Sequence, residues 1–140
     1  MTVIQVYTAF RSGTFAERSA ARIGLAAAVV LLRLPFRHTA RVVRFARRFG
    51  RRPLTPGHAE ELVAAVRYVG RRWPVRIACM ESSLGAVLAA AILRRHLTWC
   101  LGARFTPPPV EYHAWAELPG HGPVGEYTEG GWHHHTALSI

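Results

Sequence analysis

Several common residue types are missing from this chain of 140 residues. It has no lysine and no aspartate, so all 18 basic residues are arginine and all 8 acidic residues are glutamate. Any carboxylate that orients a histidine here must therefore come from a glutamate. The two cysteines are too few for a disulfide framework. Such a low number of cysteines is typical of a protein from a reducing cytoplasm.

Long apolar segments are missing as well. The longest apolar stretch, Gly24 to Leu32, covers nine residues between Arg22 and Arg33, whereas a membrane-spanning helix needs about 20. The first residues do not show the basic segment followed by an apolar one that marks a secretory signal. We therefore expect no membrane span and a cytoplasmic location.

The length and composition fit one folded domain. Half of the residues are apolar, which is enough for a hydrophobic core. We expect a single domain over residues 1–140, with a helical, arginine-rich half up to residue 73 and a catalytic helix and sheet over residues 74–140. The formal net charge of +10 favours an acidic partner, unless the arginines only form a solvated face.

The first half of the chain carries three helix patterns. Thr14 and Glu17 form a capping box for a helix that should run to about Leu34. A second helix fits residues 38–49, and a third begins at Thr55 and Pro56. In the second helix the apolar face consists of Val42, Phe45, Ala46 and Phe49, and the basic face of Arg41, Arg44, Arg47 and Arg48. In the third helix the stripe expected to be buried consists of Leu62, Ala65, Val66 and Val69.

The second half changes from helix to strand. Residues 79–95 are rich in alanine and leucine, and they are apolar nearly all round after Ser83, which predicts a central buried helix. Strands are expected over residues 97–105 and 111–118, with a short third strand over residues 124–127 after a Pro-Gly turn. The sequence thus predicts an α+β fold in which a central helix packs on a small antiparallel sheet.

Cys79 is the candidate nucleophile because it opens the predicted central helix. A thiol at a helix N-terminus feels the positive end of the helix dipole, which lowers its pKa and favours the reactive thiolate. The free N–H groups there can also face the oxyanion of a tetrahedral intermediate. The alternative is a small buried hydrophobic residue with no chemistry.

His113 is the candidate base, on the alternating strand over residues 111–118. Its face also carries Trp115 and Glu117, and catalysis would require this face to meet the helix of Cys79. A Cys–His pair needs a third group to hold the ring. Glu126 is the candidate because a neighbouring strand lies about 4.8 Å away, whereas Glu117 lies roughly 13 Å along the same strand.

The order of these residues, together with three local motifs, carries a resemblance to a known family. The motifs are Cys-x-Glu-Ser at residues 79–82, Thr-Trp-Cys-x-Gly at 98–102 and His-Ala-Trp at 113–115. Residues 78–127 resemble the transglutaminase-like leader peptidase of lasso-peptide biosynthesis, and the helical half resembles it loosely. The chain departs from the family in having Glu126 where the triad acid is commonly aspartate, and in a slightly longer turn before it.

The resemblance implies a papain-like fold and a cysteine peptidase with Cys79, His113 and Glu126 as its triad, without cofactor or metal. Such enzymes remove the leader from a ribosomally made precursor peptide. A separate winged-helix-like protein would supply leader recognition, since the chain lacks a pattern for that domain before Thr14. The ATP-dependent macrolactam cyclase, which joins the freed amine to a carboxylate, is a further candidate partner.

Other functions remain open at this level. The same triad could transfer the acyl group to an amine, as a true transglutaminase does. The arginine-rich helices could form a binding module, but no nucleic-acid signature accompanies them, and aromatic residues do not interleave with the arginines. We read Cys100 as a buried structural thiol. We expect an irregular tail, and not a metal site, at His133–His135, because adjacent strand residues point to opposite faces.

Overall fold

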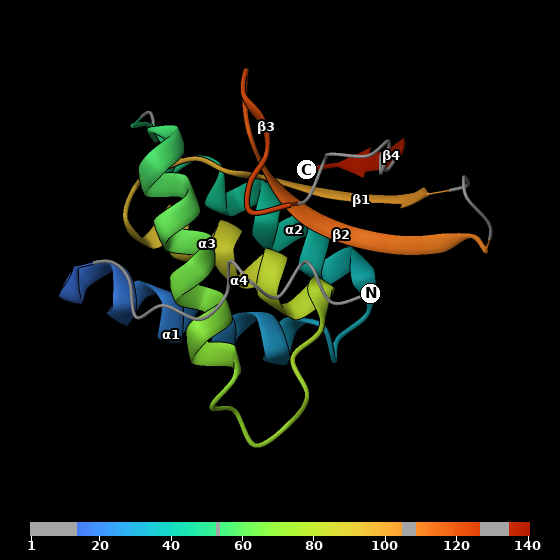
Figure 1. The fold of residues 1–140 in the computed structure, drawn as a ribbon, viewed down its shortest axis with the longest axis horizontal. Helices are drawn as coiled ribbons and strands as arrows, with labels where there is room; N and C mark the ends of the chain where they lie inside the picture. The colour runs from blue at the N-terminus through green and yellow to red at the C-terminus, as the bar shows by residue number, and fades with distance from the viewer. Residues whose placement is uncertain (1–13, 53, 105–108, 127–134) are drawn as a thin grey trace.

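The computed structural model describes residues 14–52, 54–104, 109–126 and 135–140 (Figure 1). Within these ranges, four helices precede a four-stranded antiparallel sheet, whose strand order is β3-β2-β1-β4. This is the expected α+β fold. The elements are α1 (Phe15–Leu31), α2 (Phe36–Ala46), α3 (Pro56–Gly70), α4 (Cys79–Ile92), β1 (Thr98–Arg104), β2 (Glu111–Leu118), β3 (Gly122–Pro123) and β4 (His135–Ser139).

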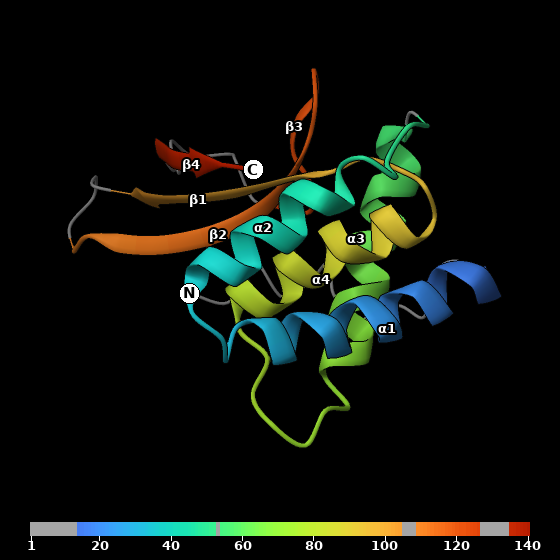
Figure 2. The same ribbon diagram turned by 180° about the vertical axis from the view of Figure 1, so that it is seen from behind.

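Helix α4 lies at the centre of the molecule. The eight consecutive residues from Ser83 to Ala90 are all buried, because α4 packs against α1, α2, α3 and the sheet. Figures 1 and 2 show the sheet on one side of α4 and α1 on the opposite side. An apolar segment without a polar face is stable only in such surroundings.

Glycine allows α1 and α4 to approach each other closely. A Cβ atom on Gly24 would lie 2.6 Å from the carbonyl oxygen of Gly85 and 2.8 Å from the backbone nitrogen of Ala89. A Cβ atom on Gly85 would lie 3.2 Å from the Cα atom of Leu25. The two backbones therefore meet directly, which fixes the helix that carries Cys79.

The predicted helix starts are confirmed for α1 and α3. The hydroxyl of Thr14 accepts a hydrogen bond from the Glu17 N–H at 3.2 Å, and that of Thr55 accepts one from the His58 N–H at 3.3 Å. These bonds satisfy N–H groups that have no partner inside the helix. Helix α4 begins at Cys79 as expected and ends at Ile92, three residues before the predicted end.

Helix α2 differs from its prediction in both its bounds and its buried face. It begins at Phe36, directly after Pro35, and ends at Ala46, three residues before the predicted end; it buries Thr39, Ala40, Val43 and Ala46. Of the predicted apolar face only Ala46 is buried, whereas Val42, Phe45 and Phe49 are exposed. Small side chains face the core because α2 packs closely on it, and the large ones remain at the surface.

The sheet confirms two predicted strands and corrects the rest. Strand β2 has the predicted bounds, and β1 lies within its predicted range. The short third strand is Gly122–Pro123, so residues 124–126 follow the strand and do not form it. The irregular tail expected at His133–His135 was wrong for His135, which begins β4 on the other side of β1.

In the part of the chain that the structure describes, no helix combines the length and apolar character needed to cross a bilayer.

Candidate active site

Cys79 occupies the first position of α4, where its thiol is half-buried. The preceding residue, Ala78, has no side chain that can cap the helix. Instead the carboxylate of Glu81 accepts a hydrogen bond from the Ala78 N–H at 3.0 Å. Glu81 therefore fixes the turn that presents the thiol, which explains one residue of the Cys-x-Glu-Ser motif.

His113 brings its ring to this thiol from β2. The helix packs on the opposite set of β2 residues, since Ala116 and Leu118 belong to the core, so the expectation that the helix meets the histidine face was wrong. Among the described residues β3 pairs only with Glu117 and Leu118, so this pairing ends before His113. The ring of His113 forms a hydrogen bond with Cys79.

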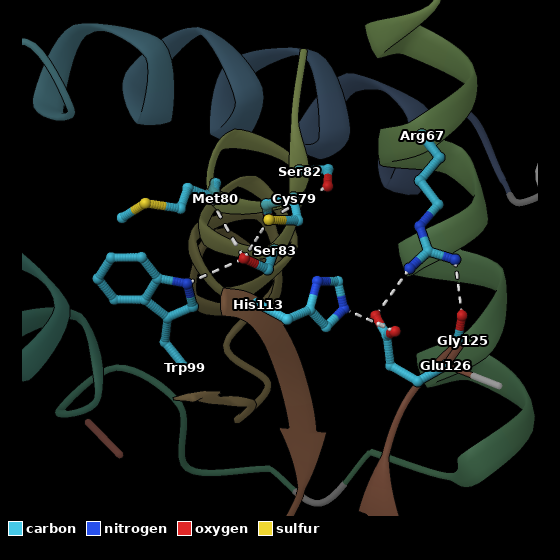
Figure 3. A network of polar contacts seen from close by, with 9 residues as sticks. All are labelled: Arg67, Cys79, Met80, Ser82, Ser83, Trp99, His113, Gly125 and Glu126. Atoms are coloured by element: carbon cyan, nitrogen blue, oxygen red, sulfur yellow. Dashed lines mark hydrogen bonds and ion pairs between the residues drawn. The ribbon is translucent and has the colours of Figure 1, made fainter. Parts of the chain in front are cut away.

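Glu126 holds the other side of the ring. Its Oε2 atom lies 2.8 Å from Nε2 of His113, which leaves Nδ1 to face the thiol. Figure 3 shows the ring between the sulfur of Cys79 and the carboxylate of Glu126. The structure thus brings together the three residues that the sequence singled out, from the start of α4, the middle of β2 and the segment after β3.

The surroundings favour the charged forms of the Cys–His pair. The hydrogen bond with His113 lowers the pKa of the Cys79 thiol below its usual 9.0, against burial, which raises it; the N–H groups of Ala114 and Met80 lower it further. Burial disfavours the charged His113 ring, but its bonds with Cys79 and Glu126 outweigh this and raise its pKa to about 9. Both shifts favour a thiolate next to an imidazolium, which is the reactive form of a cysteine nucleophile.

Arg67 of α3 fixes the position of Glu126, and sequence reasoning missed it. One guanidinium nitrogen lies 3.0 Å from Oε1 of Glu126, and the other donates to the carbonyl oxygen of Gly125 at 2.7 Å (Figure 3). Both side chains of the ion pair are largely buried, with 16% and 11% of their surface exposed. A single guanidinium therefore holds the backbone and the side chain of this segment, in the fork geometry that arginine provides.

A second polar chain holds the backbone of Cys79. The hydroxyl of Ser83 donates to the carbonyl oxygen of Cys79 and accepts a hydrogen bond from Nε1 of Trp99 at 3.0 Å. Trp99 is fully buried in β1. The first turn of α4 is thus tied to the sheet, and the Trp of the Thr-Trp-Cys motif acts through Ser83 on the turn that carries the thiol.

The comparison with protein families agrees with this geometry. The family described as the transglutaminase-like superfamily matches residues 21–139. The chain belongs to the transglutaminase-like superfamily. Domains of this superfamily typically act as cysteine peptidases or acyltransferases, which is the chemistry that a thiolate beside an imidazolium supports. No curated protein and no solved structure gives a significant match to the chain.

The rival acid occupies a different place in this transglutaminase-like domain. Oε2 of Glu117 lies 3.2 Å from the sulfur of Cys100 and accepts a hydrogen bond from Nε1 of Trp115 at 3.3 Å. Burial and the neighbouring Glu117 raise the pKa of the Cys100 thiol to about 12. Cys100 therefore stays protonated and lacks the reactivity of a thiolate.

Trp115 also contacts the histidine. Its ring stacks on that of His113 with 6.0 Å between the centroids and 20° between the planes. Gly102 lies opposite His113 in the register of β1 and β2. Because it has no side chain, it leaves space for the Trp115 ring; a Cβ atom at this position would lie 2.9 Å from that ring. The His-Ala-Trp motif thus pairs the histidine with the ring that limits its movement.

The last candidate from the sequence was the histidine cluster near the C-terminus. His133 and His134 lie outside the described residues, and His135 begins β4. Within the described ranges, no group of three or more His, Cys, Asp or Glu side chains could hold a metal ion.

Proposed function

We propose that this protein is a cysteine peptidase that removes the leader from a lasso precursor peptide. Cys79 acts as nucleophile, His113 as acid and base, and Glu126 as the group that orients the ring. The observation that carries the proposal is the continuous line from the Cys79 thiol through the His113 ring to the Glu126 carboxylate.

The reaction follows from the charged forms of this pair. The thiolate attacks the carbonyl carbon of the scissile bond, and the free N–H groups at the start of α4 stabilise the oxyanion. The His113 imidazolium then donates its proton to the leaving amine as the C–N bond breaks, which leaves a thioester on Cys79. Next, His113 takes a proton from water as the water attacks the thioester, and the C–S bond breaks to release the leader carboxylate and the thiolate.

The choice of substrate rests on the similarity of residues 78–127 to leader peptidases of lasso-peptide biosynthesis. The structure gives physical roles to several residues of the shared motifs, namely Glu81, Trp99 and Trp115. Cleavage frees the α-amine of the core peptide, which a separate ATP-dependent cyclase would then join to a carboxylate. We further propose that a separate leader-recognition protein delivers the precursor, so the chain alone should cleave it slowly.

Mass spectrometry of the precursor peptide after incubation with the chain and the recognition protein tests this proposal. We expect free leader and free core peptide from the wild-type chain and from Cys100→Ala, and uncut precursor from Cys79→Ala. Cleavage at the wild-type rate by Cys79→Ala would refute the peptidase mechanism. A leader joined to an added amine, with little free leader acid, would show acyl transfer in place of hydrolysis.

A further inference from the structure

An apolar groove lies on the face formed by α1, α2 and the end of α4, away from the active site. Its volume is about 390 Å³, and its walls include Ala27 of α1, Val42 and Phe45 of α2, Phe49 in the turn after α2, and Leu88 and Ile92 of α4. Figure 2 shows α1 and α2 on either side of α4 on this face. Ile92 is 13 residues from Cys79 along α4, or about 20 Å at 1.5 Å per residue, so the groove is separate from the catalytic site.

Several walls of the groove are large side chains that the core leaves exposed. Phe45, Phe49 and Ile92 are 57%, 49% and 47% exposed. On α1, Ile23 and Val30 lie four residues before and three residues after Ala27, which places them on the same side of the helix, and both are exposed. Exposed apolar side chains gathered around one groove mark an interaction site.

Positive charge surrounds these walls. Residues 18–59, which include most of α1 and all of α2, contain ten arginines and no acidic residue. Arg41 is exposed and lies one turn before Phe45 on α2, Arg33 is exposed and follows Val30 by three residues, and Arg94 lines the end of the groove. An occupant of this groove must therefore combine apolar residues with negative charge.

We propose that the groove binds an acidic amphipathic helix of a partner protein. Two neighbouring helices form a concave surface that a third helix can enter with apolar residues at helical spacing. Its acidic flanks would then face the arginines on both walls. A second copy of the chain fits poorly because it brings the same arginine-rich surface and a formal net charge of +10. A bilayer presents a flat surface and not the ridge that a groove accepts.

The test is direct binding to the full chain, measured by fluorescence anisotropy. The probe is a labelled peptide of about 18 residues, long enough to form a helix, with leucine at i, i+3, i+4 and i+7 and glutamate on the flanks. The comparison peptides have lysine in place of each glutamate, or the same composition without the helical spacing. We expect the glutamate peptide to bind at least about tenfold more tightly than either, and its affinity to fall with added salt.

Matched variants locate the binding surface. Phe45→Gln and Phe49→Gln together should weaken binding of the glutamate peptide by about tenfold or more, since apolar anchors dominate such interfaces. Val75→Gln, another exposed apolar residue outside the groove, should leave it unchanged. Arg41→Gln should weaken binding and reduce its salt dependence, and Arg76→Gln should do neither.

Three results would overturn the proposal. The first is equal affinity for the glutamate and lysine peptides, or an affinity that the Phe45 and Phe49 substitutions do not change. The second is a dimer in sedimentation analysis that dissociates when Phe45 and Phe49 are replaced, which would assign the groove to a second copy. The third is binding to phosphatidylserine vesicles without binding to the peptide, which would assign it to a membrane surface. None of these measurements depends on peptidase activity.

Discussion

Replacing Glu126 by glutamine removes the charge that holds the His113 ring and tests the assignment of the third residue. The carboxylate of Glu126 is 11% exposed and lies 2.8 Å from Nε2 of His113. A hydrogen bond to a charged group contributes about 1.5–3 kcal/mol, and one pKa unit corresponds to 1.36 kcal/mol. Removing this carboxylate should therefore lower the pKa of His113 by about 1–2 units from its value of about 9.

Titration of the histidine rings by NMR measures this shift without a substrate, with the His113 signal assigned from the His113→Ala variant. We expect Glu126→Gln to titrate at lower pH than the wild type, and the alkaline limit of kcat/KM to move with it, because the imidazolium must donate its proton to the leaving group. Activity should fall by orders of magnitude without vanishing, since the carboxylate orients the ring and does not react.

The same raised pKa has a consequence for stability. The folded state binds the proton of His113 more tightly than the unfolded state, whose histidine titrates near 6.5. This contribution to the free energy of unfolding is thus fully present below pH 6.5 and is lost as the pH rises through about 9. Glu126→Gln should make the loss smaller and shift it to lower pH, as denaturant unfolding at several pH values would show.

Glu117→Gln provides the matched control, because Glu117 contacts Cys100 and Trp115. It should leave the titration of His113 and the rate of cleavage close to wild type. If Glu117→Gln impairs the enzyme and Glu126→Gln does not, the third residue is wrongly assigned, although the Cys–His pair would stand. An unchanged pKa of His113 in Glu126→Gln would refute the electrostatic reasoning itself.

Three further predictions concern the thiols, the arginine and the helix contact. At neutral pH iodoacetamide should modify Cys79 and spare Cys100, whose pKa is about 12; peptide mapping that finds Cys100 modified first would contradict this. Arg67→Met should lower the free energy of unfolding by about 3 kcal/mol and reduce kcat, with partial recovery in Arg67→Lys. A wild-type free energy of unfolding and a wild-type kcat in Arg67→Met would show that Arg67 does not hold Glu126 in place. Gly24→Ala should destabilise the fold by about 1–3 kcal/mol, because the added Cβ meets backbone. Gly57→Ala, which meets no atom within 4 Å, is its control in the same urea titration.

The sequence predicted those parts of the fold that depend on local pattern. Thr14 and Thr55 are caps that act within three residues, and β2 shows its alternation over its whole length. Strand β4 was missed because its five residues gain a partner only by pairing with β1, far away in the chain. The third strand was misplaced by two residues because pairing with Glu117 and Leu118, and not composition, determines where β3 lies.

The face of α2 shows a limit of a different kind. Large apolar residues at Val42, Phe45 and Phe49 predicted an apolar face, yet the structure buries the small residues around Val43. Hydrophobic periodicity detects that a face is apolar, but it does not distinguish a core contact from a surface that another molecule covers. The exposed residues of the predicted face, Val42, Phe45 and Phe49, line the groove.

Some residues of the candidate site could be predicted from local sequence patterns, and one depends on contacts between distant parts of the chain. Cys79, His113 and Glu126 could be selected from their order along the chain, because a helix start and a strand are visible in sequence. Arg67 could not, since it lies 59 residues before Glu126 and meets it only when α3 packs beside the segment after β3. With Arg67 included, opposite charges alternate from thiolate to imidazolium to carboxylate to guanidinium, so the site is neutral within a strongly basic chain. This arrangement also suits a glutamate as the third residue of the site. The side chain of Glu126 has one more torsion to fix than an aspartate side chain would have. The Arg67 guanidinium supplies the additional constraint, because it holds both the Oε1 atom of Glu126 and the carbonyl oxygen of the preceding residue.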